Sequence, residues 1–264
     1  MAGSLHAYVI MGAHHDIIPI EITSNVDAVQ DANRQGCFIC GQELVYAREA
    51  SQRLCVLCGQ EFNTHIHCPA GHFVCDRCHR IDAVDWIEHA CLNSKAEDPI
   101  QLATELMRSA WVNVHGPEHH FLVPAVMLTA VYNRTHVPEL IPTAIKQARR
   151  RAAEVPGGFC GYQGACGGAI GAGIFMSIYT GATPLSQNEF VHSNRLTSQC
   201  LLEIAEIGGP RCCKRSTYLS LEIAARYLEK YFSIELPLAK PVKCTFFEDN
   251  LECLLDTCPY YKPL

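Results

Sequence analysis

The chain has 264 residues, a formal net charge of −6, and 48% hydrophobic against 18% charged residues. This composition is that of a globular protein and excludes a wholly disordered chain. The negative net charge gives no general attraction to nucleic acid or to an anionic membrane surface, although local basic patches could still bind anions.

Sixteen cysteines are the most informative part of the composition. Residues 1–25 show no basic start followed by an apolar core and a small-residue cleavage site, which a secretory signal would need. We therefore expect a cytoplasmic protein whose thiols stay reduced. In that compartment such cysteines serve metal binding or catalysis rather than disulfides.

In chain order, residues 1–35 are expected to form an N-terminal extension, in which the β-branched run at 17–22 suits a short edge strand. Residues 36–95 follow as a zinc-binding module made of knuckles and turns. Its knuckle region contains too few periodic apolar positions for a core, so this module needs a metal ion to fold.

Residues 96–235 predict a mainly α fold, a bundle of about six helices. Asp98 as N-cap and Pro99 as the first helical residue open the first helix, and Gly181 ends the fourth. Residues 236–264 form a proline-rich tail that contains cysteines. The expected helices span residues 99–112, 122–134, 138–154, 167–180, 190–207 and 210–232.

One stretch, residues 159–185, carries no charged residue and is long enough to span a bilayer. Its first part is rich in glycine, and its apolar part, residues 169–179, is too short for a span. We expect a buried core helix here and no membrane association.

The N-terminal module contains two Cys-x-x-Cys-Gly knuckles, built on Cys37 with Cys40 and on Cys55 with Cys58. The glycine after each pair eases the tight turn that aims backbone amides at thiolate sulfurs. Four thiolates at this spacing suit tetrahedral zinc, and they would also suit a single iron. A redox dithiol is the alternative use of such pairs.

A second group of metal ligands follows within residues 68–79. It fits a Cys₃His zinc site, with His65, His67 and His79 as competing ligands. The run resembles the centre of RING-type and treble-clef zinc modules. In a cross-brace, ligand pairs one and three share one metal and pairs two and four the other. Whether the sites are consecutive or cross-braced stays open. The predicted ligands are Cys68, His72, Cys75 and Cys78.

A third set of cysteines lies in the helical region, at or near two predicted helix starts. Exposed amides and the positive end of the helix dipole favour thiolates there, and Arg211 and Lys214 add positive charge suited to binding a cofactor. These thiols could hold an iron–sulfur cluster or act as a dithiol/disulfide pair. The alternative is small residues in a tight helix crossing. The four cysteines are Cys160, Cys166, Cys212 and Cys213.

Glu118, His119 and His120 offer a general base and metal ligands immediately before an apolar helix. Adjacent histidines point apart on a regular element, so at most one of them faces a given site. Helix capping and solvated charge are the alternative. The basic turn at residues 146–151 is most simply explained as a solvent-exposed helix face. The alternative is a site that binds an anion or the tRNA backbone.

The tail contributes a further metal-like triad, Cys244, Cys253 and Cys258. Tetrahedral thiolate sites need four ligands, and the local sequence offers no fourth. Cys91, a histidine or an exogenous group would have to complete the site. Free buried thiols are the alternative.

The chain resembles an uncharacterised, cysteine-rich prokaryotic family over about residues 36–262. The resemblance rests on the zinc knuckles, Gly-Pro-Glu-His-His-x-x-x-Pro at 116–124, Cys-Gly-x-x-Gly-Ala-Cys-Gly at 160–167, Cys-Cys-Lys-Arg at 212–215 and a Cys-Pro tail. It is also distantly similar to the redox family named for its C-GCAxxG-C-C pattern, although Cys-Gly-Gly-Ala departs from that order. These resemblances imply redox chemistry and assign no reaction.

Two functions are consistent with these features. The first is a cytosolic metalloenzyme with structural zinc and an iron–sulfur or reactive-thiol site in the helical region, used for redox or sulfur transfer. Its expected partners are a small anionic substrate or a protein that donates sulfur or electrons. The second is a zinc-dependent adaptor that binds a protein or RNA without catalysis, of which RNA is not favoured because the knuckle region is acidic.

Overall fold

The structure is a computed structural model that describes residues 37, 39–75, 78, 82–238 and 240–262. Residue contacts group the described residues into one compact unit. The short strand expected within residues 17–22 lies outside the described residues.

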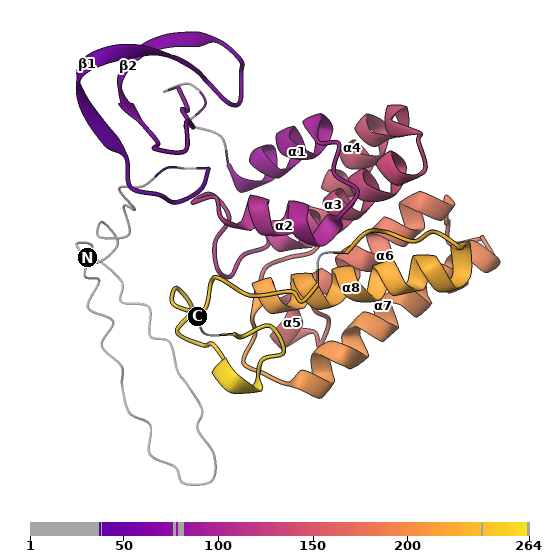
Figure 1. Ribbon diagram of the computed structural model, residues 1–264. Helices are drawn as coiled ribbons and strands as arrows, with labels where there is room; N and C mark the ends of the chain where they lie inside the picture. The colour runs from indigo at the N-terminus through magenta and orange to yellow at the C-terminus, as the bar shows by residue number, and fades with distance from the viewer. Residues whose placement is uncertain (1–36, 38, 76–77, 79–81, 239, 263–264) are drawn as a thin grey trace, which may run out of the picture. The chain divides into compact units, whose positions relative to one another are not determined.

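Helices form most of the described structure, which confirms the prediction of a mainly α fold (Figure 1). Two short 3₁₀ helices, η3 (Pro138–Leu140) and η4 (Leu255–Thr257), accompany the α-helices. The α-helices are α1 (Ala83–Asn93), α2 (Pro99–Met107), α3 (Glu118–Arg134), α4 (Ile141–Ala152), α5 (Phe159–Tyr162), α6 (Gly167–Thr180), α7 (Asn188–Ile207) and α8 (Cys213–Phe232).

Several predicted helix ends were wrong. α3 begins at Glu118 rather than at residue 122, and two further ends follow local hydrogen bonds. α2 ends before Ser109, whose carbonyl accepts a hydrogen bond from the N–H of Val112 (3.1 Å) and so turns the chain. α8 begins at Cys213 rather than near Pro210, because the Sγ of Cys212 accepts the N–H of Arg215 (3.4 Å) and caps the helix. α1, within the expected knuckle module, was not predicted.

The N-terminal module also contains a β-hairpin that was not predicted. Strands β1 (Val45–Leu54) and β2 (Glu61–His67) pair antiparallel, with an irregularity between Tyr46 and Ser51. The Cys55–Gln60 knuckle forms the turn between them. Most residues of both strands are exposed or half-buried, so the hairpin has no core of its own, and a two-stranded hairpin is marginal in water without one.

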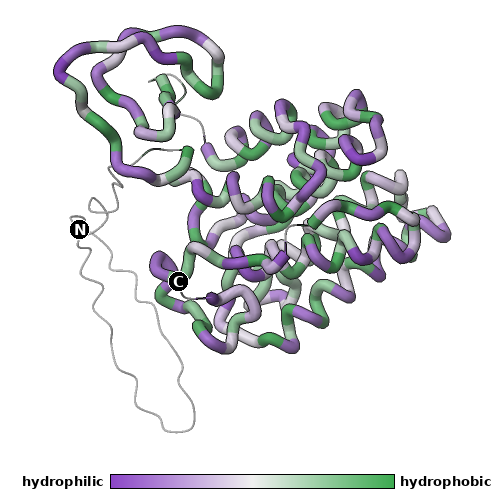
Figure 2. Tube along the Cα trace, viewed as in Figure 1, coloured by the Kyte–Doolittle hydropathy of each residue, from purple (hydrophilic) through white to green (hydrophobic). Residues whose placement is uncertain are grey.

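Helix α3 is the centre of the helical core. Every residue from Glu118 to Tyr132 is buried, and the helix packs against α1, α2, α4, α6 and α8. A helix that is covered on all sides in this way belongs to the core of a bundle. Hydrophilic and hydrophobic residues alternate along the helices around it, as amphipathic helices require (Figure 2).

Helix α6 approaches α3 closely because of its glycines. A Cβ on Gly171 would lie 2.9 Å from the carbonyl oxygen of His120 and 3.0 Å from Cδ of Pro124. Pro124 has no N–H to bond that oxygen, so the backbone of α6 can lie against it. On its other faces α6 meets Thr197 of α7 at Gly173 and Ser216 of α8 at Gly168. These contacts bring the starts of α6 and α8 beside α3.

Replacing Gly171 with leucine should lower the free energy of unfolding by about 3 kcal/mol, because the added side chain would force α3 and α6 apart. Chemical denaturation monitored by circular dichroism measures the change. Gly157→Leu is the matched control, since a Cβ there meets nothing within 4 Å. Equal stability of the two variants would contradict the close approach of the helices.

Helix α6 is the buried core helix expected from the charge-free stretch, and it has 14 residues. Within the described part of the chain, no helix combines the length and the apolar character that crossing a bilayer requires.

Candidate functional site

The eight predicted ligands of the N-terminal module form two groups of four that could each hold a metal ion. Within each group all ligand atoms lie within 4.8 Å of one another. The first and third ligand pairs make one group, and the second and fourth pairs make the other. The sites are therefore cross-braced rather than consecutive. The groups are Cys37, Cys40, Cys68 and His72, and Cys55, Cys58, Cys75 and Cys78.

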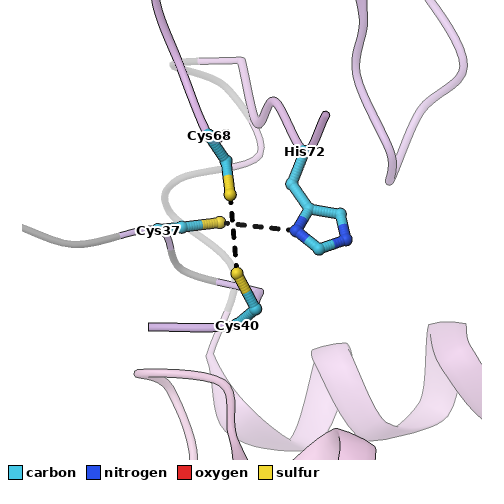
Figure 3. A group of neighbouring side chains, drawn as sticks. All are labelled: Cys37, Cys40, Cys68 and His72. Atoms are coloured by element: carbon cyan, nitrogen blue, oxygen red, sulfur yellow. Dashed lines mark hydrogen bonds between the residues drawn. The ribbon is translucent and has the colours of Figure 1, made fainter. Parts of the chain in front are cut away.

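The spacing within each group is that of ligands around a single ion. The Sγ of Cys37 lies 3.8 Å from Nδ1 of His72, and the two side chains point toward those of Cys40 and Cys68 (Figure 3). The Sγ atoms of Cys40 and Cys68 are 3.5 Å apart. Tetrahedral zinc with bonds of ~2.3 Å to sulfur would place two thiolates about 3.8 Å apart.

Three local turns position these ligands. Gly41, Gly59 and Gly71 have positive φ, and the N–H of each returns to the carbonyl of the cysteine that opens its turn, at 2.7–2.8 Å. Glycine is favoured at such positions because it has no Cβ. Backbone N–H groups also point at sulfur, as from Ala70 to Cys68 (3.4 Å), which suits a thiolate that binds a metal.

Two thiols of the second group have pKa values shifted in opposite directions. Burial and the neighbouring thiols raise the pKa of Cys78 to about 12. Burial also acts to raise the pKa of Cys55, but N–H donors from Cys75, Cys58 and Leu57 outweigh it and lower the pKa to about 6. A bound metal ion would hold all four as thiolates.

The competing histidines stand outside both groups. Nδ1 of His65 lies 3.2 Å from the carbonyl oxygen of Ala47, and His67 belongs to neither ligand set. His79 lies outside the described residues.

A cavity of about 410 Å³ lies between the starts of three helices, which we call the helical cavity. Cys160 of α5, Cys166 at the N-cap of α6 and Cys213 at the start of α8 all line it. His120 and Arg211 also line it. Cys212 lines it as well, so the structure brings together all four predicted cysteines of the helical region.

The expectation of a readily formed thiolate was wrong for the vicinal pair. Burial raises the pKa of Cys213 to about 11, although the N–H of Gly116 acts in the opposite direction. Burial likewise raises the pKa of Cys212, against the N–H and the positive charge of Arg215. Removal from water outweighs the helix start at both thiols.

Glu118, His119 and His120 were expected to precede the apolar helix but form the first turn of α3, and they have different surroundings. Glu118 accepts the N–H of Asn113 (2.9 Å). His119 is fully buried, with Nε2 bonded to the carbonyl of Asn113 (3.1 Å) and Nδ1 to the hydroxyl of Thr217 (3.0 Å). Neither residue offers a free proton acceptor to the helical cavity.

His120 is the member of this trio that faces the helical cavity with a free nitrogen. Its Nδ1 lies 2.9 Å from the carbonyl oxygen of Val155. A carbonyl only accepts, so Nδ1 carries the proton and Nε2 keeps its lone pair. The ring lies against Gly167, where a Cβ would come within 2.2 Å of Nε2. Gly167 directly follows Cys166, so the lone pair lies beside the start of α6.

The side chain of Cys212 points toward the tail. Its Sγ accepts from Nδ2 of Asn250 (3.6 Å), and it lines a second, smaller cavity together with the three tail cysteines. Lys214 also lines this smaller cavity, whereas Arg211 lines the helical cavity. Asn250 was missed because an asparagine in a proline-rich tail carries no sequence signal of its own.

The basic turn at the end of α4 is partly engaged within the protein. Arg149 pairs with Asp85 (2.7 Å) and with Glu88, and Arg151 donates to the hydroxyl of Ser177 (2.8 Å). These contacts reduce the positive charge available to an anion.

A family model described as a family of unknown function, DUF5714, matches residues 87–261. A search of the curated proteins found no match, and a search of the solved structures found none either. The matched region contains the helical cavity and the tail cysteines. It begins after the two metal-binding groups, so the zinc knuckles that contributed to the family resemblance lie outside it.

Proposed function

Since the chain belongs to a family of unknown function, DUF5714, we propose its function from its own residues: thiol-dependent redox or sulfur-transfer chemistry in the helical cavity. The observation that carries this proposal is the convergence of Cys160, Cys166 and Cys213 on one cavity. Its volume of about 410 Å³ suits a small substrate.

Each residue of the helical cavity has a proposed role. Cys166 is the nucleophile, because it is half-buried and stands at the N-terminus of a 14-residue helix. Nε2 of His120 accepts the thiol proton. Cys213 is the second thiol of the pair, and Arg211, which is exposed at the rim, attracts an anionic substrate.

The reaction is thiol–disulfide exchange with a low-molecular-weight disulfide. The thiolate of Cys166 attacks one sulfur, the substrate S–S bond breaks, and the leaving thiolate takes up a proton. The thiol of Cys213 then loses its proton and attacks Cys166, forming a protein disulfide and releasing the second substrate thiol. The substrate gains two electrons and two protons, and the chain loses both. Sulfur transfer would differ in its donor: the thiolate of Cys166 would attack the outer sulfur of a persulfide, the donor's S–S bond would break, its thiolate would leave, and Cys166 would carry the persulfide.

We propose zinc for the two N-terminal groups, in a structural role. Each group has four ligands and no open position, which is typical of structural zinc sites. All sixteen cysteines, every one of them among the described residues, are free of disulfides, which supports a reducing compartment such as the cytoplasm.

3,3′-Dithiodipropionate, a small anionic disulfide, tests the proposal on the reduced full-length chain without oxygen. Mass spectrometry should find a new disulfide between Cys166 and Cys213. We expect its formation to be abolished in Cys166→Ser and slowed at least about tenfold in His120→Gln, because thiolate formation loses its proton acceptor. Cys200→Ser is the matched control, since this fully buried thiol of α7 does not line the helical cavity.

Two other outcomes would replace this proposal. If the wild type contains iron and sulfide and Cys160→Ser loses them, the helical cavity holds a cluster bound by three thiolates, with one iron open to substrate. Neither disulfide nor cluster would favour the zinc-dependent adaptor for protein or RNA. The engaged Arg149 and Arg151 support an RNA partner less than the sequence alone did.

A further inference from the structure

Four thiols from two distant parts of the sequence converge beside the start of α8. Cys212 caps that helix, and Cys244, Cys253 and Cys258 come from the tail. All four line one small cavity, whose surface is almost wholly apolar. Cys253 and Cys258 are near enough for their negative charge to act on both Cys212 and Cys244.

The tail is anchored so that these thiols stay together. The N–H of Cys244 donates to the carbonyl of Tyr260 (2.8 Å), which joins the two ends of the tail segment. The hydroxyl of Tyr260 donates to Glu222 of α8 (2.5 Å), and its ring packs on Tyr218 with centroids 5.2 Å apart. Cys212 therefore adds a fourth thiol to the tail triad.

N–H groups surround the sulfur atoms. The backbone N–H of Arg215 points at Cys212 (3.4 Å), that of Phe246 at Cys244 (3.5 Å), and that of Leu255 at Cys253 (3.5 Å). Such donors stabilise sulfur that carries negative charge, and they tune metal–thiolate centres.

Asn250 adds a side-chain donor to this set. It is buried, and its Nδ2 donates to the Sγ of Cys212. Its Oδ1 is fixed by the N–H of Glu252 (3.1 Å) and by Nε2 of His115 (3.0 Å). A buried asparagine held in this orientation fits a ligand that must be pointed in one direction.

A buried cation faces the same cavity. Lys214 is 2% exposed, and its Nζ donates to the carbonyls of Met107 and Val112 (3.1 Å each) and lies 4.6 Å from the ring centroid of Phe246. Among the described residues no carboxylate forms an ion pair with it. A buried charge needs opposite charge nearby; the negative charge of Glu118 acts on Lys214 most strongly, and Cys212 and Cys244 would add to it as thiolates.

The spacing of these thiols distinguishes them from the N-terminal groups. The four do not form a third set in which ligand atoms lie within 4.8 Å of one another. A single tetrahedral ion needs sulfurs about 3.8 Å apart, whereas a cluster in which each thiolate binds a different iron needs them further apart. We propose that Cys212, Cys244, Cys253 and Cys258 hold an iron–sulfur cluster.

This site adjoins the helical cavity, because Cys212 lines both cavities, but the three tail cysteines line only the smaller one. The proposal does not depend on the thiol chemistry proposed above. Different cysteines report on the two sites: Cys258 and Cys253 on the cluster, and Cys160 and Cys166 on the helical cavity.

The test uses the full-length chain, purified without oxygen and reconstituted with ferrous iron and sulfide. We expect ~4 irons and ~4 sulfides per chain and a visible absorption band. Both contents should fall at least tenfold in Cys258→Ser, while zinc stays unchanged. Two control variants, Cys91→Ser and Cys166→Ser, should retain iron and sulfide like the wild type. Cys91 is a fully buried residue of α1.

Three results would overturn the cluster: no iron or sulfide in the reconstituted wild type, equal contents in Cys258→Ser, or loss of a third zinc ion in place of iron. Far-ultraviolet circular dichroism checks that the variant is folded. If Cys258→Ser does not fold, the same measurement on Cys253→Ser decides, because Cys253 is only half-buried.

Discussion

Replacing Cys75 with serine should release one of the two zinc ions proposed for the N-terminal module and unfold the β1–β2 hairpin. Cys75 shares its group with Cys55 and Cys58, which form the turn of that hairpin. Structural zinc contributes ~10–16 kcal/mol to the folding of small modules. The strands bury little apolar surface, so the hairpin is only marginally stable by itself. The folding free energy lost with the zinc ion is therefore larger than the hairpin can make up.

Metal analysis by mass spectrometry and hydrogen exchange of the amides of β1 measure this effect. We expect zinc to fall from two ions to one per chain and β1 amides to lose protection, with α3 amides unchanged. Cys91→Ser is the control, because this buried cysteine belongs to neither group. Two retained zinc ions, or a protected β1, would show that Cys75 is no ligand.

Which residues bind metal in the N-terminal module could be predicted from the sequence, because a knuckle is a local structure. Cys-x-x-Cys-Gly contains the ligands and the glycine of its turn within five residues. Which pairs share an ion could not be predicted. That depends on Cys37 meeting His72 across the hairpin, and both arrangements contain the same short motifs.

Which cavity each cysteine of the helical region and the tail lines depends even more on tertiary structure. Cys212 and Cys213 are adjacent, and the sequence placed both in one site with Cys160 and Cys166. In the structure Cys212 is the extended cap residue and Cys213 the first helical residue; Cys213 lines the helical cavity alone, whereas Cys212 lines both that cavity and the smaller one at the tail. The tail that selects Cys212 begins more than twenty residues later, and only folding brings it back.

The helices were predicted where capping was strong. Asp98 accepts the N–H groups of Ile100 and Gln101 (2.8 and 3.1 Å), as the Asp-Pro pattern indicates. α6 has the predicted bounds. α1 was not predicted, although Asp82 caps it by accepting the N–H of Asp85 (2.9 Å). Its 11 residues directly follow the knuckles and were assigned to the knuckle module.

Acid should destabilise the helical core through His119, in the pH range below neutrality. Burial, and then the charge of Lys214, lower the pKa of His119 to about 3 from an ordinary value of 6.5. Between these values the unfolded chain binds a proton that the folded chain refuses. Stability is therefore complete above pH 6.5 and is lost as the pH falls, by about 2 kcal/mol at pH 5.

The variant His119→Gln separates the effect of His119 from the release of metal ions in acid. Metal release occurs in the wild type and in the variant alike. A glutamine can donate its amide N–H to the carbonyl of Asn113 and accept the hydroxyl of Thr217, but it does not titrate. Urea denaturation of the helical signal from pH 5 to pH 8 should therefore show a steeper loss of stability in the wild type. Parallel curves would mean that His119 can be protonated in the folded chain. They would also remove the reason for assigning proton transfer to His120 rather than to its neighbour.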